Sequence, residues 1–162
     1  MIFVFLEISS LATYALVALG QDRRALTASF NYLIVGTIGG TLFLTGIAFL
    51  YVLTGSLNIS DIAYQLGTMP TNKIEVAAIC FIFIGLAIKC GIVPLAGWLP
   101  RVYQYSPNFV AAFSAAVSTK VALYLLAKML YVLFGKTLAL EEFALGNLLL
   151  VLAVAGIFFG GL

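Results

Sequence analysis

The chain has 162 residues, of which 64% are apolar and only 9% are charged, and its formal net charge is +2. An ordinary soluble domain carries about 25% charged residues, so this composition excludes a disordered chain, a basic nucleic-acid-binding module and a secreted disulfide scaffold. The sequence contains no histidine, which excludes histidine metal sites and histidine acid–base chemistry. We therefore expect an all-α integral membrane protein, with no cofactor and no nucleic-acid partner.

Five apolar segments follow one another along the chain, and each has about the length of a membrane-spanning helix or more. They cover approximately residues 2–19, 26–53, 74–105, 109–134 and 143–159. The longest polar stretch separates the second segment from the third, and we expect a loop at residues 55–72. The sequence thus predicts one membrane domain over residues 1–162, with about five transmembrane helices joined by short loops.

The third segment, residues 74–105, is too long for one upright span. Its second half contains two glycines and two prolines, namely Gly91, Pro94, Gly97 and Pro100. Because proline removes a backbone donor and clashes with the preceding turn, we expect the helix to be broken near residues 91–97 and followed by a short helical piece. Non-helical backbone at membrane depth survives only inside protein or beside a watery cavity, and transporters build ion sites at such breaks.

Three charged side chains lie well inside the apolar segments: Glu7, Lys89 and Lys120. Each costs about 2.5–3.5 kcal/mol at the bilayer centre on insertion scales, so we expect all three to face the interior of the helix bundle. The simplest interpretation is an ion pair of Glu7 with Lys89 that only holds two helices together. One acid cannot neutralise two lysines, however, and a desolvated lysine favours its neutral form, which suits a group that takes up and releases protons.

Two further polar residues follow Lys120 on the same predicted helix. Tyr124 and Lys128 come four and eight residues later, a spacing that predicts one shared face. Lys128 either extends a relay or reaches out to the membrane interface. Trp98, beside the helix break, is expected to be an interface anchor. The sequence shows no phosphate-binding loop, metal cluster or nucleophile–histidine pair, so no active site is expected in this chain.

Basic residues in short loops predict how a membrane protein is oriented. Arg23 and Arg24 follow the first segment and Arg101 follows the helix break, so these three are expected on one side, the cytoplasmic one. Lys73 falls on the other side, next to Glu75. This small bias places the N-terminus outside and the C-terminus inside.

Several motifs in the sequence occur in the same order in one family of membrane proteins. The motifs are Phe5-Leu6-Glu7, then Ile88-Lys89-Cys90-Gly91-Ile92-Val93-Pro94 with Trp98-Leu99-Pro100, and finally Ser118-Thr119-Lys120. Together they resemble the antiporter-like membrane subunits of respiratory NADH:quinone oxidoreductase (complex I) and of multisubunit cation/proton antiporters. The stretch Ala28-Ser29-Phe30-Asn31-Tyr32 is similar to the D-type antiporter component or the quinone-proximal respiratory one.

The resemblance implies proton translocation, or cation/proton antiport with sodium as the other ion, inside a larger membrane complex. It implies an ion pair between Glu7 and Lys89, Lys120 as the central relay lysine and Lys128 as a basic position at the end of that helix. The partners would be other membrane subunits and the lipid bilayer, in the bacterial inner membrane. Two alternatives stay open, a non-conducting structural subunit and a non-functional remnant of a split gene.

The sequence departs from the family pattern at two positions and in its length. Ala96 stands where the family often has a histidine, and Arg101 stands where an acidic residue often follows the second proline. The first departure leaves one relay step without its usual group. The family fold is built from two inverted repeats and the chain covers about one of them, so we expect a truncated fragment that does not conduct protons on its own.

Overall fold

The computed structural model describes residues 1–20, 22–70, 72–133 and 145–160, and these residues form helices and turns without a strand. The elements are α1 (Ile2–Ala18), α2 (Arg23–Thr54), α3 (Ile59–Thr68), α4 (Lys73–Cys90), α5 (Leu99–Tyr105), α6 (Asn108–Phe113), η1 (Ser114–Ser118), α7 (Thr119–Lys128), η2 (Met129–Leu133) and α8 (Leu145–Gly160). The two elements labelled η are π-helical turns. They continue the helix from α6, so that one helical stretch runs from residue 108 to residue 133.

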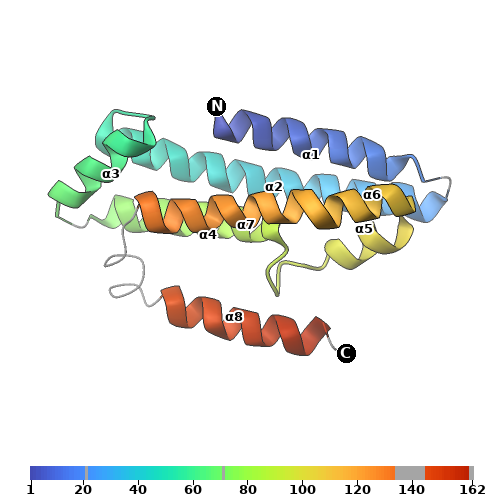
Figure 1. Ribbon diagram of the computed structural model, residues 1–162. Helices are drawn as coiled ribbons and strands as arrows, with labels where there is room; N and C mark the ends of the chain where they lie inside the picture. The colour runs from blue at the N-terminus through green and yellow to red at the C-terminus, as the bar shows by residue number, and fades with distance from the viewer. Residues whose placement is uncertain (21, 71, 134–144, 161–162) are drawn as a thin grey trace.

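The long helices lie side by side and form a bundle (Figure 1). The helices α1, α2, α4 and α7 run lengthwise, while α3 lies at one end of the bundle and α5 at the other. Because consecutive long helices alternate in direction, the end of α1, the start of α2 and α5 meet at the same end. The last helix, α8, lies outside the group formed by the other long helices (Figure 1). Its Leu149 packs against the buried core of that group.

The contact between α2 and α4 is close because glycines lie in it. A side chain at Gly85 would come within 2.7 Å of backbone atoms of Gly39 and Phe43. Small residues are common at such contacts in membrane proteins, since helices in lipid associate through close packing rather than through the hydrophobic effect. The contact is surrounded by a core of buried apolar side chains, which includes Phe43, Leu50, Ile79, Ile82, Leu86, Leu125 and Leu126.

Two helices of the described chain are long and apolar enough to cross a membrane, namely α2 and the stretch from residue 108 to 133. The helix α1 and the described part of α8 are apolar but shorter. The helix α4 has 18 residues and carries Lys73, Glu75 and Lys89. These helices, with α5 taken together with α4, begin and end within a few residues of the apolar segments of the sequence, and the end of the fourth segment and the start of the fifth lie outside the described residues.

The prediction of a loop over residues 55–72 is wrong in its central part, because α3 forms there. The Asn58 side chain accepts a hydrogen bond from the backbone N–H of Ser60 at 3.2 Å and so caps the start of the helix. Ile62 and Leu66, one turn apart, are buried against the core. A capped start and one apolar stripe are enough for a short helix that lies on a larger body.

Candidate functional site

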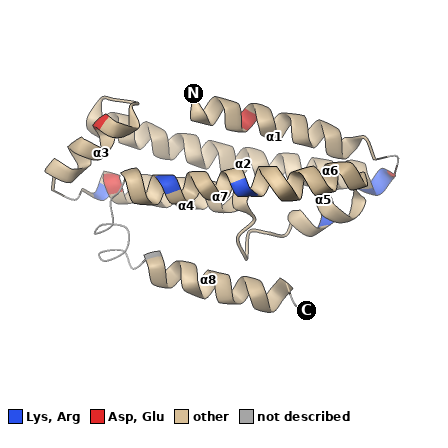
Figure 2. Ribbon diagram, viewed as in Figure 1, with Lys and Arg blue, Asp and Glu red and all other residues tan. Residues whose placement is uncertain are grey.

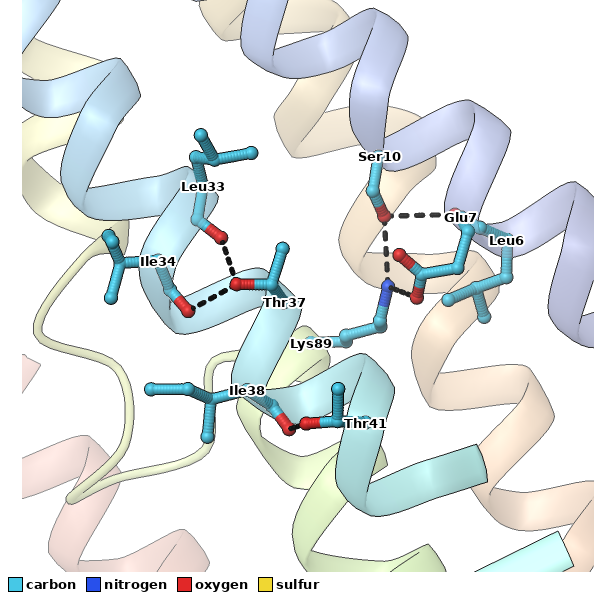
Figure 3. A network of polar contacts seen from close by, with 9 residues as sticks. All are labelled: Leu6, Glu7, Ser10, Leu33, Ile34, Thr37, Ile38, Thr41 and Lys89. Atoms are coloured by element: carbon cyan, nitrogen blue, oxygen red, sulfur yellow. Dashed lines mark hydrogen bonds and ion pairs between the residues drawn. The ribbon is translucent and has the colours of Figure 1, made fainter. Parts of the chain in front are cut away.

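An ion pair joins α1 to α4, and Figure 3 shows its side chains. Lys89 Nζ donates a hydrogen bond to Glu7 Oε1 at 2.6 Å and another to Ser10 Oγ at 3.0 Å. The Lys89 side chain is only 7% exposed and that of Glu7 is 23% exposed. Charges so far removed from solvent need a close partner, and the two side chains supply it for each other.

Two small residues complete the surroundings of this pair. Ser10 lies one turn after Glu7 on α1, and its hydroxyl donates to the Leu6 carbonyl at 2.9 Å while it accepts from Lys89. Gly40 of α2 faces the Glu7 carboxylate, and a methyl group at this position would collide with Glu7 Oε1. The sequence analysis did not identify either residue. Ser10 could have been identified, because a residue three positions after Glu7 on a helix lies on the same face. Nothing in the sequence distinguishes Gly40 from the other glycines of α2.

The helix α4 ends one residue after Lys89, and turns occupy most of residues 91–98 before α5 begins at Leu99. Gly91 has a φ of 71°, which glycine adopts without the penalty that other residues incur. The N–H of Ile92 donates to the Ala87 carbonyl at 3.0 Å and that of Gly91 to the Ile88 carbonyl at 3.2 Å, the hydrogen-bond pattern of a Schellman cap.

The other residues expected at the break lie in the turns or just after them. Pro94 and Gly97 belong to the turns, and the Val93–Pro94 peptide bond is cis. Pro100 lies in the first turn of α5, where the missing N–H has no helical acceptor to lose. The chain therefore leaves α4 directly beside Lys89 and resumes a helix only at the end of the bundle.

Trp98 is buried at the break, with 5% of its surface exposed, so the expectation of an interface anchor is wrong. Its indole N–H donates to the Ile88 carbonyl at 3.1 Å, in the last turn of α4. Its ring stacks on Tyr32 of α2 with the centroids 4.3 Å apart, and Tyr32 meets the ring of Tyr14 edge-on. The Ile88 carbonyl thus accepts both the Gly91 N–H and the indole N–H, and α2 supplies the aromatic ring on which Trp98 stacks.

A cavity of about 430 Å³ lies beside the ion pair, between α1, the end of α4 and the helix of residues 108–133. Most of its lining is apolar. The polar side chains that line it include Ser10, Lys89, Ser118, Tyr124 and Lys128. The Ser118 hydroxyl is buried and has no hydrogen-bond partner among the described residues. Polar groups spaced along a cavity of this size suit a short file of water molecules.

Lys120 and Lys128 point in different directions, which corrects the expectation of a shared face and of an interior Lys120. Lys128 is half-buried and lines the cavity, whereas Lys120 is exposed and does not line it. Lys120 Nζ instead donates to the Ala115 carbonyl at 2.7 Å and contacts Thr119 Oγ1 at 3.4 Å. The reason is helical geometry, since eight residues at 3.6 per turn leave an angular offset of about 80°.

Comparison with known proteins gives consistent matches over the whole chain. Residues 1–162 match the family described as "NADH:quinone oxidoreductase/Mrp antiporter, TM". The N-type subunit of the NADH-quinone oxidoreductase of Desulforudis audaxviator is 48% identical over 130 residues, which are 80% of this chain and 26% of that protein. The D-type subunit of the Na(+)/H(+) antiporter of Alkalihalophilus pseudofirmus is 33% identical over 160 residues, which are 98% of this chain and 31% of that protein.

A solved structure shows a similar arrangement of helices. A chain of the membrane-bound sulfane sulfur reductase (MBS), an archaeal respiratory membrane complex, matches with a TM-score of 0.81 and 32% sequence identity. The match covers 93% of this chain and 30% of that one. The chain therefore spans between about a quarter and a third of the length of the proteins that it matches.

Proposed function

The chain belongs to the NADH:quinone oxidoreductase/Mrp antiporter membrane family, and on that premise we propose that it contributes part of a proton-translocating or cation/proton-antiporting path to a larger membrane complex. Its relatives are named as subunits of a quinone oxidoreductase and of a sodium/proton antiporter, and a similar chain occurs in a respiratory membrane complex. The observation that carries the proposal is the half-buried Glu7–Lys89 pair, which lies beside a cavity and next to a helix break.

The proposed path begins at this pair. A carboxylate at hydrogen-bond distance stabilises the protonated form of a lysine, whereas desolvation favours the neutral form. Separation of Glu7 from Lys89 would therefore release a proton towards the cavity, and closure of the pair would favour its uptake. The Schellman-capped end of α4 places Lys89 in the last turn of the helix, directly before a non-helical stretch.

Beyond the pair, hydroxyl groups and a second lysine are the next proton-carrying groups of the proposed path. Ser118 and Tyr124 line the cavity on the side opposite α1, and Lys128 lies farther along the same helix. Lys120 faces away from the cavity, so we propose that it takes its proton on the outer face of this helix, where other parts of the complex pack. The π-helical turn η1 ends two residues before Lys120, and such turns frequently occur at functional sites.

We also propose that the chain crosses the membrane about five times, as part of an inverted-repeat fold with its third helix broken. The two long apolar helices supply two of the crossings, and α1, α4 and α8 would supply the others. Other membrane subunits would cover the apolar side chains that this chain leaves exposed, such as Phe109 and Ile157. The bacterial inner membrane is the proposed location.

The test separates a conducting subunit from a structural one. The complex that contains the chain is isolated from native membranes and reconstituted into liposomes, and proton and sodium movement are measured. The double variant E7Q/K89Q removes both charges of the pair without leaving one of them buried alone. If the pair only holds helices together, this variant assembles and translocates at the parent rate, and the proposal is wrong. If translocation is lost while assembly persists, the conducting role stands.

A matched variant controls for the loss of a charge as such. Lys73 lies exposed in the first turn of α4, at the end of that helix opposite to Lys89. K73Q should assemble and translocate like the parent. A chain that is a non-functional remnant would give a different result altogether, because no complex containing it would be recovered from the membranes of the cells that produce it.

A further inference from the structure

Three arginines gather in a pocket at one end of the bundle. Arg23 and Arg24 come from the first turn of α2, and Arg101 comes from α5 after the helix break. Together with Thr27, Gln104 and Tyr105 they line a pocket of about 610 Å³. Figure 2 shows basic positions on α5 and on the start of α2 at this same end, away from the basic positions of α7.

These positive charges are not neutralised within the described part of the chain. None of the three arginines takes part in an ion pair there, and Arg24 lies over the ring of Tyr105 at 5.9 Å from its centroid. The nearest acid in sequence, Asp22, does not line the pocket and does not cap α2 through its side chain. The uncapped first turn of α2 adds its backbone N–H groups to the positive charge at this end.

The chemistry of the pocket selects a phosphate group. A guanidinium presents its N–H donors as a planar fork that matches two oxygens of a phosphate. Arginines on two separate helices reach such a group from two directions, which a single surface arginine cannot do. Thr27 and Gln104 supply neutral polar side chains to the same pocket.

The surface next to the pocket is apolar and therefore favours an amphiphilic ligand over a free anion. Leu26, Phe30 and Ile34 follow Arg23 at three, seven and eleven residues, so they form one stripe along α2, and they are 61%, 60% and 45% exposed. The helix α2 has 32 residues, or about 48 Å at 1.5 Å per residue, which exceeds a hydrocarbon core of about 30 Å. Its first turn therefore reaches the headgroup level while the stripe runs into the acyl region.

We propose that this pocket binds an anionic phospholipid, with the phosphate between Arg23, Arg24 and Arg101 and an acyl chain along the stripe of Leu26, Phe30 and Ile34. The lipid belongs to the leaflet that faces this end of the bundle. It holds the start of α2 to α5, the helix that follows the break, so it fixes one side of the segment through which α4 leaves Lys89. The binding itself does not depend on whether the chain conducts ions.

The test uses the purified full chain in a neutral detergent, titrated with phosphatidylglycerol, phosphatidylcholine or inorganic phosphate and followed by native mass spectrometry. Phosphatidylglycerol should bind more tightly than the other two. Since each basic residue near an anionic headgroup contributes on the order of a fivefold change in affinity, R101Q and R24Q should each weaken the binding of phosphatidylglycerol about fivefold. R101K should weaken it less, and K73Q, at the other end of the bundle, should leave it unchanged.

Four results would overturn the proposal. Equal binding of phosphatidylcholine would show that the charge of the headgroup does not contribute to the affinity. Binding of inorganic phosphate as tight as that of the lipid would make the pocket a site for a free anion. An equal loss of phosphatidylglycerol affinity in K73Q would show that the arginine variants act only through the net charge of the chain. Displacement of the lipid by a glutamate-rich peptide at similar concentration would identify a docking site for an acidic protein segment. Circular dichroism of each variant verifies that the helices are intact.

Discussion

Gly40 of α2 lies directly against the carboxylate of Glu7 on α1, so close that a methyl group in its place would collide with Glu7 Oε1. The carboxylate occupies the space that the glycine leaves, and from there it reaches Lys89 on α4. Three helices thus determine the geometry of one ion pair. The position of Gly40 is set by its helix, so the carboxylate, not the glycine, would have to move.

We therefore expect G40A to weaken the Glu7–Lys89 pair and to destabilise the chain. Adding a methyl group to a well-packed contact costs about 1–3 kcal/mol. The measurement is the free energy of unfolding in mixed detergent micelles. G67A on α3 is the matched control, because nothing lies within 4 Å of a side chain there; its stability should stay the same or rise by up to about 1 kcal/mol, as alanine favours helix. Equal stability of both variants would contradict the close approach.

The second prediction concerns the charges themselves. E7Q leaves Lys89 with a neutral partner in a site where its side chain is 7% exposed. Loss of one partner from a fully buried pair costs about 3–5 kcal/mol, because the other charge remains without its counter-ion; since this pair is part-buried, we expect a loss between that range and the roughly 1 kcal/mol of an exposed pair. E7Q/K89M should recover most of this loss, since the methionine fills the apolar space of the lysine stem. Unfolding measurements on both single variants and on the double variant give the coupling energy; a coupling near zero would mean that the pair does not form in the membrane.

The third prediction tests the closure of the helix break by Trp98. W98F keeps an aromatic ring for the stack on Tyr32 but removes the indole N–H that Ile88 accepts from. The Ile88 carbonyl keeps its bond from the Gly91 N–H, so the variant loses one hydrogen bond, worth about 0.5–1.5 kcal/mol, and the end of α4 should open more often. Amide hydrogen exchange at Gly91 and Ile92, which carry the cap, should become faster. Y124F, which changes an aromatic residue that is 68% exposed, should leave this exchange unchanged.

The sequence predicted those features that depend on single strong local signals. Prolines and glycines over residues 91–100 indicated where a helix cannot continue, and charges in apolar segments marked Glu7 and Lys89. It did not predict which way Lys120 points, because a helix that is apolar on most faces carries no periodic signal that assigns one face to the interior. The helix α3 was not predicted for the opposite reason, since its apolar stripe consists of few residues within a polar stretch.

Trp98 shows a further limit of the same kind. A tryptophan beside a proline in a membrane segment is typical of an interface anchor, and only the position of Tyr32 on another helix turns it into a buried residue. Gly40 likewise differs from its neighbouring glycines only through Glu7, which lies on another helix. Both roles arise from tertiary contacts, so no local pattern contains them.

The last prediction separates the two lysines of the helix from residue 108 to residue 133. Lys120 is exposed, and among the described residues it bonds to the Ala115 carbonyl and Thr119 of its own helix, so K120Q should change the free energy of unfolding of this chain by no more than about 0.5 kcal/mol. If Lys120 is a relay group, the same variant should nevertheless abolish ion translocation in the reconstituted complex while assembly persists. K128Q should also slow translocation, because Lys128 lines the cavity. A K120Q complex that translocates at the parent rate, beside an inactive K128Q complex, would place the path through the cavity alone and remove Lys120 from it.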